Sequence, residues 1–142
     1  MTARLLFRIA AVLFLLFAAG HTFGFRTFTP PTAEGLAVRD AMFNVRFGHD
    51  LSYGGFYVGF GLYVSAYLIF SAFLSWNLSS LAVRLPQAIG GVGWTLFGVQ
   101  LASLALCCIY FGGPPAVFSA LVAVCIGWAM YLARVSTPLP AL

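Results

Sequence analysis

The sequence predicts an all-α integral membrane protein whose helices form a four-helix bundle in the bilayer. Of its 142 residues, 62% are apolar and only 7% are charged, whereas an ordinary soluble domain is about 45–50% apolar and about 25% charged. So few charged side chains cannot cover a water-soluble surface, and the same composition excludes intrinsic disorder and a coiled coil. Segments that can cross a hydrocarbon core about 30 Å thick lie at residues 5–25, 54–76, 88–111 and 116–133.

The first span begins with basic residues. Arg8 lies near its start, from where the long side chain can reach the membrane surface. Arg4, Arg8 and the small residues around Gly20 also resemble a signal peptide, but the apolar run continues past Gly20. We therefore expect the segment to remain as a transmembrane helix. With four crossings in residues 1–142, we expect a single transmembrane domain and no extramembrane domain.

The first loop, residues 26–53, is the only sizeable polar segment. Pro30 and Pro31 end the first helical region, and Thr32 can cap a new helix. Residues 33–47 place apolar side chains in two opposed stripes, which predicts a short helix lying in the outer membrane interface. The remaining connections are short: an inner loop at residues 77–87 and a tight outer turn at residues 112–115.

The charged residues indicate orientation rather than a polyanionic partner. The net charge of +4 comes from seven Arg and three acids, and the arginines are scattered, which argues against nucleic-acid binding. Both termini are expected in the cytoplasm, because cytoplasmic segments carry the excess of basic residues. In that orientation the cytoplasmic arginines are Arg4, Arg8, Arg84 and Arg134, and the outer loop carries Arg26, Arg39 and Arg46.

Small residues recur at intervals of four, the spacing at which helices in membranes approach closely. We expect these positions to be contacts inside the bundle, and the alternative is a docking face for another membrane protein. The residues concerned are Gly55, Gly59, Gly61, Ser65, Ser119, Ala123 and Gly127.

Two histidines are the candidate cofactor-binding residues. His21 lies near the outer end of the first span, and His49 lies just before the second, so both belong to the same membrane face. Imidazoles there can ligate a metal or haem iron or hydrogen-bond a quinone, with Asp50 as a supporting partner of His49. The alternative is simple anchoring at the interface, since no third ligand stands at a recognisable spacing. The sequence names no metal and no specific cofactor.

Other polar residues have simpler expected roles. Arg46 and Asp50 are one helical turn apart and can form an ion pair, and Gln100 should make an interhelical hydrogen bond in the third span. The cysteines Cys107, Cys108 and Cys125 have no C-x-x-C spacing and are expected to pack as small apolar residues. None of the common catalytic motifs is present.

Several short motifs together resemble a group of small, uncharacterised bacterial inner-membrane proteins with four helices. They are Gly20-His21-Thr22, Met42-Phe43, the run from Tyr53 to Leu62, and Tyr110-Phe111 followed by Pro114. The resemblance covers most of the chain and implies a four-span fold in a bacterial inner membrane, with no known activity.

These observations lead to three functional expectations. The first is a non-catalytic accessory or scaffolding subunit of a larger membrane complex, of respiratory or photosynthetic type, with other membrane subunits and the lipid bilayer as partners. The second is a redox, quinone-handling or haem-handling membrane protein that uses His21 and His49. The third is a binder of lipid or of a hydrophobic small molecule.

Overall fold

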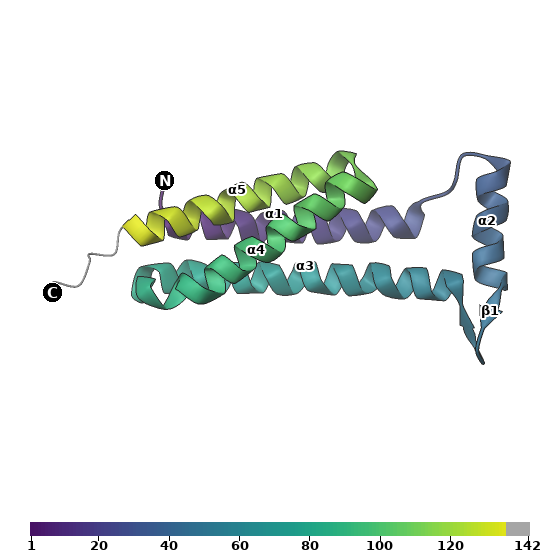
Figure 1. Cartoon of the computed structure of the whole chain (residues 1–142), viewed down its shortest axis with the longest axis horizontal. Coiled ribbons are helices and arrows are strands. Elements are labelled where there is room, and N and C mark those ends of the chain that lie inside the picture. The colour runs from purple at the N-terminus through teal and green to yellow at the C-terminus, as the bar shows by residue number, and fades with distance from the viewer. Residues whose placement is uncertain (136–142) are drawn as a thin grey trace. The chain divides into compact units, whose positions relative to one another are not determined.

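The computed structural model describes residues 1–135 and confirms the all-α fold with four long apolar helices (Figure 1). Each of these helices is long and apolar enough to cross a bilayer. The four candidate spans are α1 (Ala3–Thr27), α3 (Tyr53–Arg84), the stretch Pro86–Phe111 that contains α4 (Gly90–Leu106), and α5 (Gly113–Val135). The chain is therefore an integral membrane protein with four candidate spans.

The first loop contains the expected short helix. This helix, α2 (Ala33–Asn44), begins at Thr32, whose hydroxyl accepts a hydrogen bond from the Gly35 amide at 3.1 Å. The prediction that it continues to Phe47 is wrong. The chain instead forms a short β-hairpin with two residues in each strand, in which β1 (Arg46–Phe47) pairs with β2 (Leu51–Ser52). The turn between the strands contains Gly48 at φ +69°. That backbone conformation costs glycine nothing, and it reverses the chain where a helix would continue.

The prediction of an inner loop at residues 77–87 is also wrong in extent. The connection is shorter, because α3 continues to Arg84. Asn77 and Ser79 suggest a loop by composition, but both side chains hydrogen-bond to carbonyls of their own helix, and Ser79 is fully buried. The 32 residues of α3 extend about 48 Å at 1.5 Å per residue, about 37 Å even at a tilt of about 40°. The helix is therefore longer than the hydrocarbon core is thick.

The second half of the chain is a helical hairpin with irregular ends. A 3-10 turn, η1 (Pro86–Ile89), leads into α4, and a wider turn, η2 (Cys107–Phe111), ends it. The Gly112 amide donates to the Cys107 carbonyl at 2.7 Å, and Gly112 has φ +59°. α5 then begins at Gly113, inside the turn expected at residues 112–115. Prolines fit there because amides of a first helical turn have no partner within the helix.

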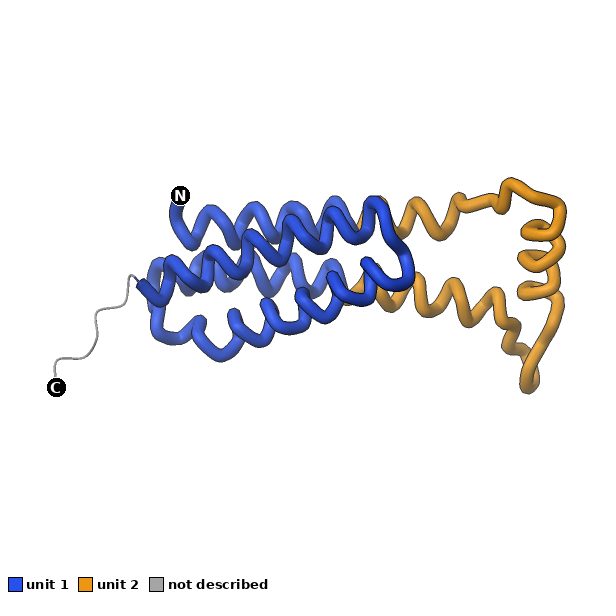
Figure 2. The backbone as a smooth tube through the Cα atoms, turned by 45° about the horizontal axis from the view of Figure 1, so that its top comes forward, with its two compact units in different colours: residues 1–17, 68–142 blue, residues 18–67 orange. Residues whose placement is uncertain are grey.

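The chain divides into two compact units (Figure 2). Unit 1 comprises residues 1–17 and 68–142, and unit 2 comprises residues 18–67. The boundary falls inside α1 and α3, so each of these helices contributes to both units. The last residues, 136–142, and with them the expected cytoplasmic C-terminus, lie outside the described residues.

Unit 1 has a tightly packed apolar core. α4 and α5 pack along each other through reciprocal contacts in which glycine of one helix faces a large side chain of the other: Gly93 faces Met130, and Gly127 faces Phe97. A Cβ atom on Gly127 would stand 2.8 Å from the Phe97 ring, closer than real Cβ contacts allow. From α1, Phe17 stacks on Phe118 of α5 with ring centroids 5.5 Å apart.

Unit 2 has no comparable core. It pairs the end of α1 with the start of α3, and α2 runs across the ends of both (Figure 1). α2 has no buried residue, and it contacts α3 through the Phe43 ring, which lies against Gly54. The hairpin adds Phe47, whose ring lies 4.8 Å from that of Tyr53. Aromatic side chains therefore connect α2 and the hairpin to the start of α3.

Candidate functional site

A polar cluster connects α1 to α3 inside unit 2. The His21 Nδ1 atom lies 3.2 Å from the Ser65 hydroxyl, and the Thr22 hydroxyl lies 2.7 Å from the same oxygen. Thr22 donates to the Ala18 carbonyl at 2.8 Å, and Ser65 is buried and lies 3.1 Å from the Gly61 carbonyl. Both helices are candidate membrane spans, so these are interhelical polar contacts of the kind that stabilise helix pairs in lipid.

Counting hydrogens in this cluster assigns the histidine tautomer. His21, Ser65 and Thr22 each bring one hydrogen when the imidazole is neutral. The cluster has four contacts, because the Ser65 hydroxyl also donates to the Gly61 carbonyl, so if the imidazole hydrogen is on Nδ1 the three hydrogens satisfy three of the four contacts. If it is on Nε2, only the two hydroxyl hydrogens remain, and two of the four contacts are satisfied. The network favours the Nδ1–H form, which leaves the Nε2 lone pair free.

The imidazole is continuous with an aromatic layer. The centroid of its ring lies 5.2 Å from that of the Phe25 ring. The Phe25 ring in turn stands edge-on to the Tyr57 ring, with the two centroids 6.4 Å apart. Phe25 rests on Gly61, where a Cβ atom would come within 2.8 Å of the ring. Glycine at this position therefore lets α3 approach α1 at the level of the histidine.

Tyr57 also lines an open apolar hollow of about 330 Å³ on unit 2. The volume lies at the lower end of the range found for small-molecule sites, which are mostly apolar with a few polar groups. Its lining residues come from α2 and α3: Met42, Tyr53, Phe56, Tyr57 and Phe60. His21 is two ring contacts away from this hollow, through Phe25 and Tyr57.

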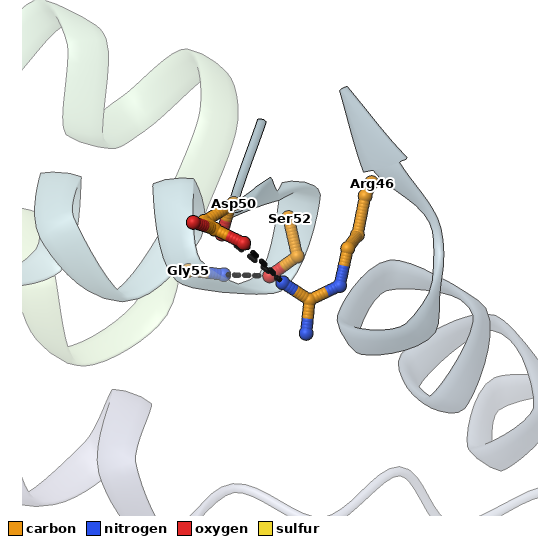
Figure 3. Close-up of polar contacts among 4 residues, drawn as sticks. All are labelled: Arg46, Asp50, Ser52 and Gly55. Atoms are coloured by element: carbon orange, nitrogen blue, oxygen red, sulfur yellow. Dashed lines mark hydrogen bonds and ion pairs between the residues drawn. The ribbon is translucent and has the colours of Figure 1, made fainter. Parts of the chain in front are cut away.

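The second histidine lies in a different setting. His49 is exposed in the turn of the hairpin, outside the network of His21. The expected pairing of its neighbour Asp50 with Arg46 is present: a carboxylate oxygen lies 3.7 Å from the guanidinium, which also donates to the Asp50 carbonyl at 3.4 Å (Figure 3). Both side chains are well exposed to solvent.

The same close-up shows how α3 begins. The Gly55 amide donates to the Ser52 hydroxyl at 3.0 Å, which makes Ser52 the cap of the helix (Figure 3). Gly55 is therefore part of the first turn, and its nearest side-chain neighbour is this cap.

The other small residues expected at helix contacts fall into two groups. Gly61 and Ser65 lie against α1, Ser119 and Ala123 are buried, and Gly127 lies against α4. Gly55 and Gly59 are exposed instead, and nothing lies within 4 Å of a Cβ atom built on Gly59. The Gly55–Gly59 face is therefore not a contact within the described chain.

Gln100 makes the expected interhelical hydrogen bonds. Its Nε2 atom donates to the carbonyl and to the hydroxyl of Ser119, both at 3.1 Å, and the Cys107 sulfur lies 3.7 Å from that hydroxyl.

Within residues 1–135, no three His, Cys, Asp or Glu side chains gather where they could hold a metal ion.

Sequence reasoning missed the partners of His21. Thr22 and Ser65 are 43 residues apart, and no local pattern connects them. The signal that was available is the spacing of Gly61 and Ser65, which places both on one face of α3, and that of His21 and Phe25 on α1. The buried row Ser71, Ser75 and Ser79, also at intervals of four, was overlooked too.

Together these features define the class: a small integral membrane protein with four candidate spans and an interhelical polar cluster near an aromatic surface. The sequence matches no known protein family and no curated protein, and the structure matches no solved structure. The class therefore rests on the chain's own composition and geometry.

Proposed function

We propose that the protein binds a hydrophobic small molecule of the quinone or lipid type between α1, α2 and the start of α3. The observation that carries this proposal is the free Nε2 atom of His21, next to an aromatic layer that continues into an apolar hollow. Nε2 accepts a hydrogen bond from a hydroxyl of the ligand, and the hollow receives its apolar part. An ionisable residue within a membrane span is a functional candidate by default.

The experiment is a binding titration of the purified full chain with a short-chain ubiquinol, followed by fluorescence. His21→Ala should weaken binding about tenfold, the effect of losing one hydrogen bond of about 1.4 kcal/mol. His49→Ala is the matched control and should bind as the unaltered protein does. The dimethyl ether of the same quinol, which cannot donate, should bind the unaltered protein as weakly as the quinol binds His21→Ala.

Two results would reject this function. One is equal affinity of the unaltered protein and His21→Ala for the quinol. The other is the absence of binding by the quinol, the quinone and every lipid that mass spectrometry finds co-purified with the protein.

A second function, a non-catalytic accessory subunit of a larger membrane complex, is favoured by the exposed Gly55–Gly59 face. Exposed glycine at this spacing allows another helix to approach closely. Isolation of native complexes in mild detergent tests it: Gly59→Leu should release the chain from a larger assembly. Gly98→Leu, at an equally open glycine of α4, should not. Migration of the unaltered chain as a small particle would exclude this role.

We further propose that the protein lies in a bacterial cytoplasmic membrane with its N-terminus and C-terminus inside. The support is the distribution of arginines near the chain ends and at the end of α3. In a cysteine-free variant, a cysteine at Thr29 should react with a membrane-impermeant maleimide in whole cells, and one at Arg84 should not. The reverse pattern would invert the orientation.

A further inference from the structure

Unit 1 carries four arginines, and no acidic side chain lies among its described residues. It contains Arg4, Arg8, Arg84 and Arg134, and all three acids of the sequence, Glu34, Asp40 and Asp50, belong to unit 2. α1 begins at the end of unit 1 where α3 and α5 finish (Figure 2). The four arginines are close to those helix ends, so one end of the unit is positively charged.

Arg8 differs from the other three. Arg4, Arg84 and Arg134 are exposed, whereas Arg8 is partly buried and its Nε atom is enclosed without a hydrogen-bond partner. The guanidinium carbon lies 5.0 Å from the centre of the Trp76 ring. This cation–π contact holds the group in place, but it offers none of the five N–H donors an acceptor. Among the described residues, no side chain or carbonyl accepts a hydrogen bond from Arg8.

Both residues of this pair lie within about three helical turns of the helix ends at this end of unit 1. Arg8 is five residues into α1, about 8 Å from the start of the helix at 1.5 Å per residue. A long basic side chain there extends toward the membrane surface, and tryptophan is enriched at the same level. Beside the pair, Val12 of α1 and Phe73 of α3 are exposed and apolar, which provides a surface for acyl chains.

We infer that Arg8 and Trp76 form a binding site for the phosphate of an anionic phospholipid. The guanidinium supplies paired donors to two phosphate oxygens, which is its preferred geometry with this group. The positive end of unit 1 selects an anionic over a zwitterionic headgroup, because the neighbouring arginines add attraction at short range.

The test is native mass spectrometry of the full chain with phosphatidylglycerol or phosphatidylcholine of identical acyl chains. The unaltered protein should retain phosphatidylglycerol at least tenfold better. Arg8→Gln should remove most of this preference, whereas Arg84→Gln, which removes the same charge at the same end, should reduce it less than twofold. Arg8→Lys should fall between, because it keeps the charge and loses the paired donors. It also gives a result if Arg8→Gln does not fold.

Three results would overturn the inference. Equal losses in Arg8→Gln and Arg84→Gln would mean diffuse attraction to the whole charged end. The absence of any preference between the two lipids would mean that no such site exists. Full displacement of phosphatidylglycerol by millimolar inorganic phosphate would show a site for free phosphate and not for a lipid.

Discussion

The two units of this protein share α1 and α3 and are held together differently. Among the buried apolar side chains of the described residues, only Ala18 belongs to unit 2, and all others belong to unit 1. Unit 1 is stabilised by close packing of helices, while unit 2 depends on the His21–Thr22–Ser65 cluster and on contacts between aromatic rings. The same two helices are therefore stabilised by apolar burial in unit 1 and by polar and aromatic contacts in unit 2.

The units also differ in charge. Unit 1 has four arginines and no acid, whereas in unit 2 the arginines and acids are equal in number, three of each. A net positive charge is attracted to an anionic membrane surface. A set of arginines balanced by acids does not attract an ionic partner from a distance. We therefore place the anionic lipid on unit 1 and the uncharged hydrophobic ligand on unit 2.

The largest difference between the units should come from phenylalanines of α1. Phe14 is fully buried in unit 1, and Phe23 is 71% exposed in unit 2. Phe14→Ala should lower the free energy of unfolding by about 3 kcal/mol, because a buried ring leaves a cavity. Phe23→Ala should change it by less than about 0.5 kcal/mol. Unfolding in detergent with increasing denaturant measures both, and similar losses would abolish the distinction between the units.

A smaller effect is expected where α3 approaches α1 in unit 2. In Gly61→Ala the new methyl group would come within 2.8–2.9 Å of the Phe25 ring, so the helices must separate. The free energy of unfolding should fall by about 2 kcal/mol, a typical cost of overpacking. Gly59→Ala adds the same methyl group in open space, and an unchanged or slightly higher stability is expected. Equal behaviour of the two variants would contradict the contact at Gly61.

Removing the central hydroxyl of the polar cluster should have a moderate effect. Ser65→Ala should cost about 1 kcal/mol, the scale of interhelical hydrogen bonds in membranes. It should also shift the His21 tautomer toward Nε2–H, which the nitrogen chemical shifts of the imidazole report. In the control Ser79→Ala, the lost hydrogen bond runs to the Trp76 carbonyl of the same helix, and His21 should not change. An Nε2–H form already present in the unaltered protein would refute the hydrogen count.

The smallest effect is expected at the hairpin. Asp50→Asn removes an ion pair of 3.7 Å between exposed side chains, and the midpoint of unfolding should not move measurably. Ser52→Ala, two residues away, removes the cap of α3 and should cost about 1 kcal/mol, which shows that the measurement detects local changes. A clear loss in Asp50→Asn would give the hairpin a structural role beyond this ion pair.

Much of the fold could be predicted from local sequence. The four spans were predicted from the length of their apolar segments, and the start of α2 was predicted from the capping residue Thr32. The turn near the start of α5 was predicted from its glycines and prolines. Each of these features depends on neighbouring residues alone. The two wrong boundaries have different causes. Asn77 and Ser79 have loop-like composition, yet burial of Ser79 keeps α3 helical, and pairing of β1 with β2 ends α2 early. Burial overrode local propensity at Ser79, whereas at the end of α2 the short-range pairing of the hairpin did so.

Only part of the candidate site could be predicted from the sequence. The sequence singled out His21 together with His49, because two imidazoles at one membrane face can ligate a metal or hydrogen-bond a quinone. It gave His49 equal weight, since two histidines near one face look alike without their surroundings. The network with Thr22 and Ser65, and the contact of Arg8 with Trp76, join residues far apart in the chain, so no spacing rule reveals them.

By itself, the sequence determined that this chain is a four-span membrane protein, because apolar content and segment length are sums over neighbouring residues and need no packing information. Only the tertiary structure decided which face of each helix is buried, which tautomer His21 favours, and which arginine is partly buried against a tryptophan ring. These properties depend on distances between side chains of different helices, and the helix–helix packing that sets them is not encoded at any fixed spacing.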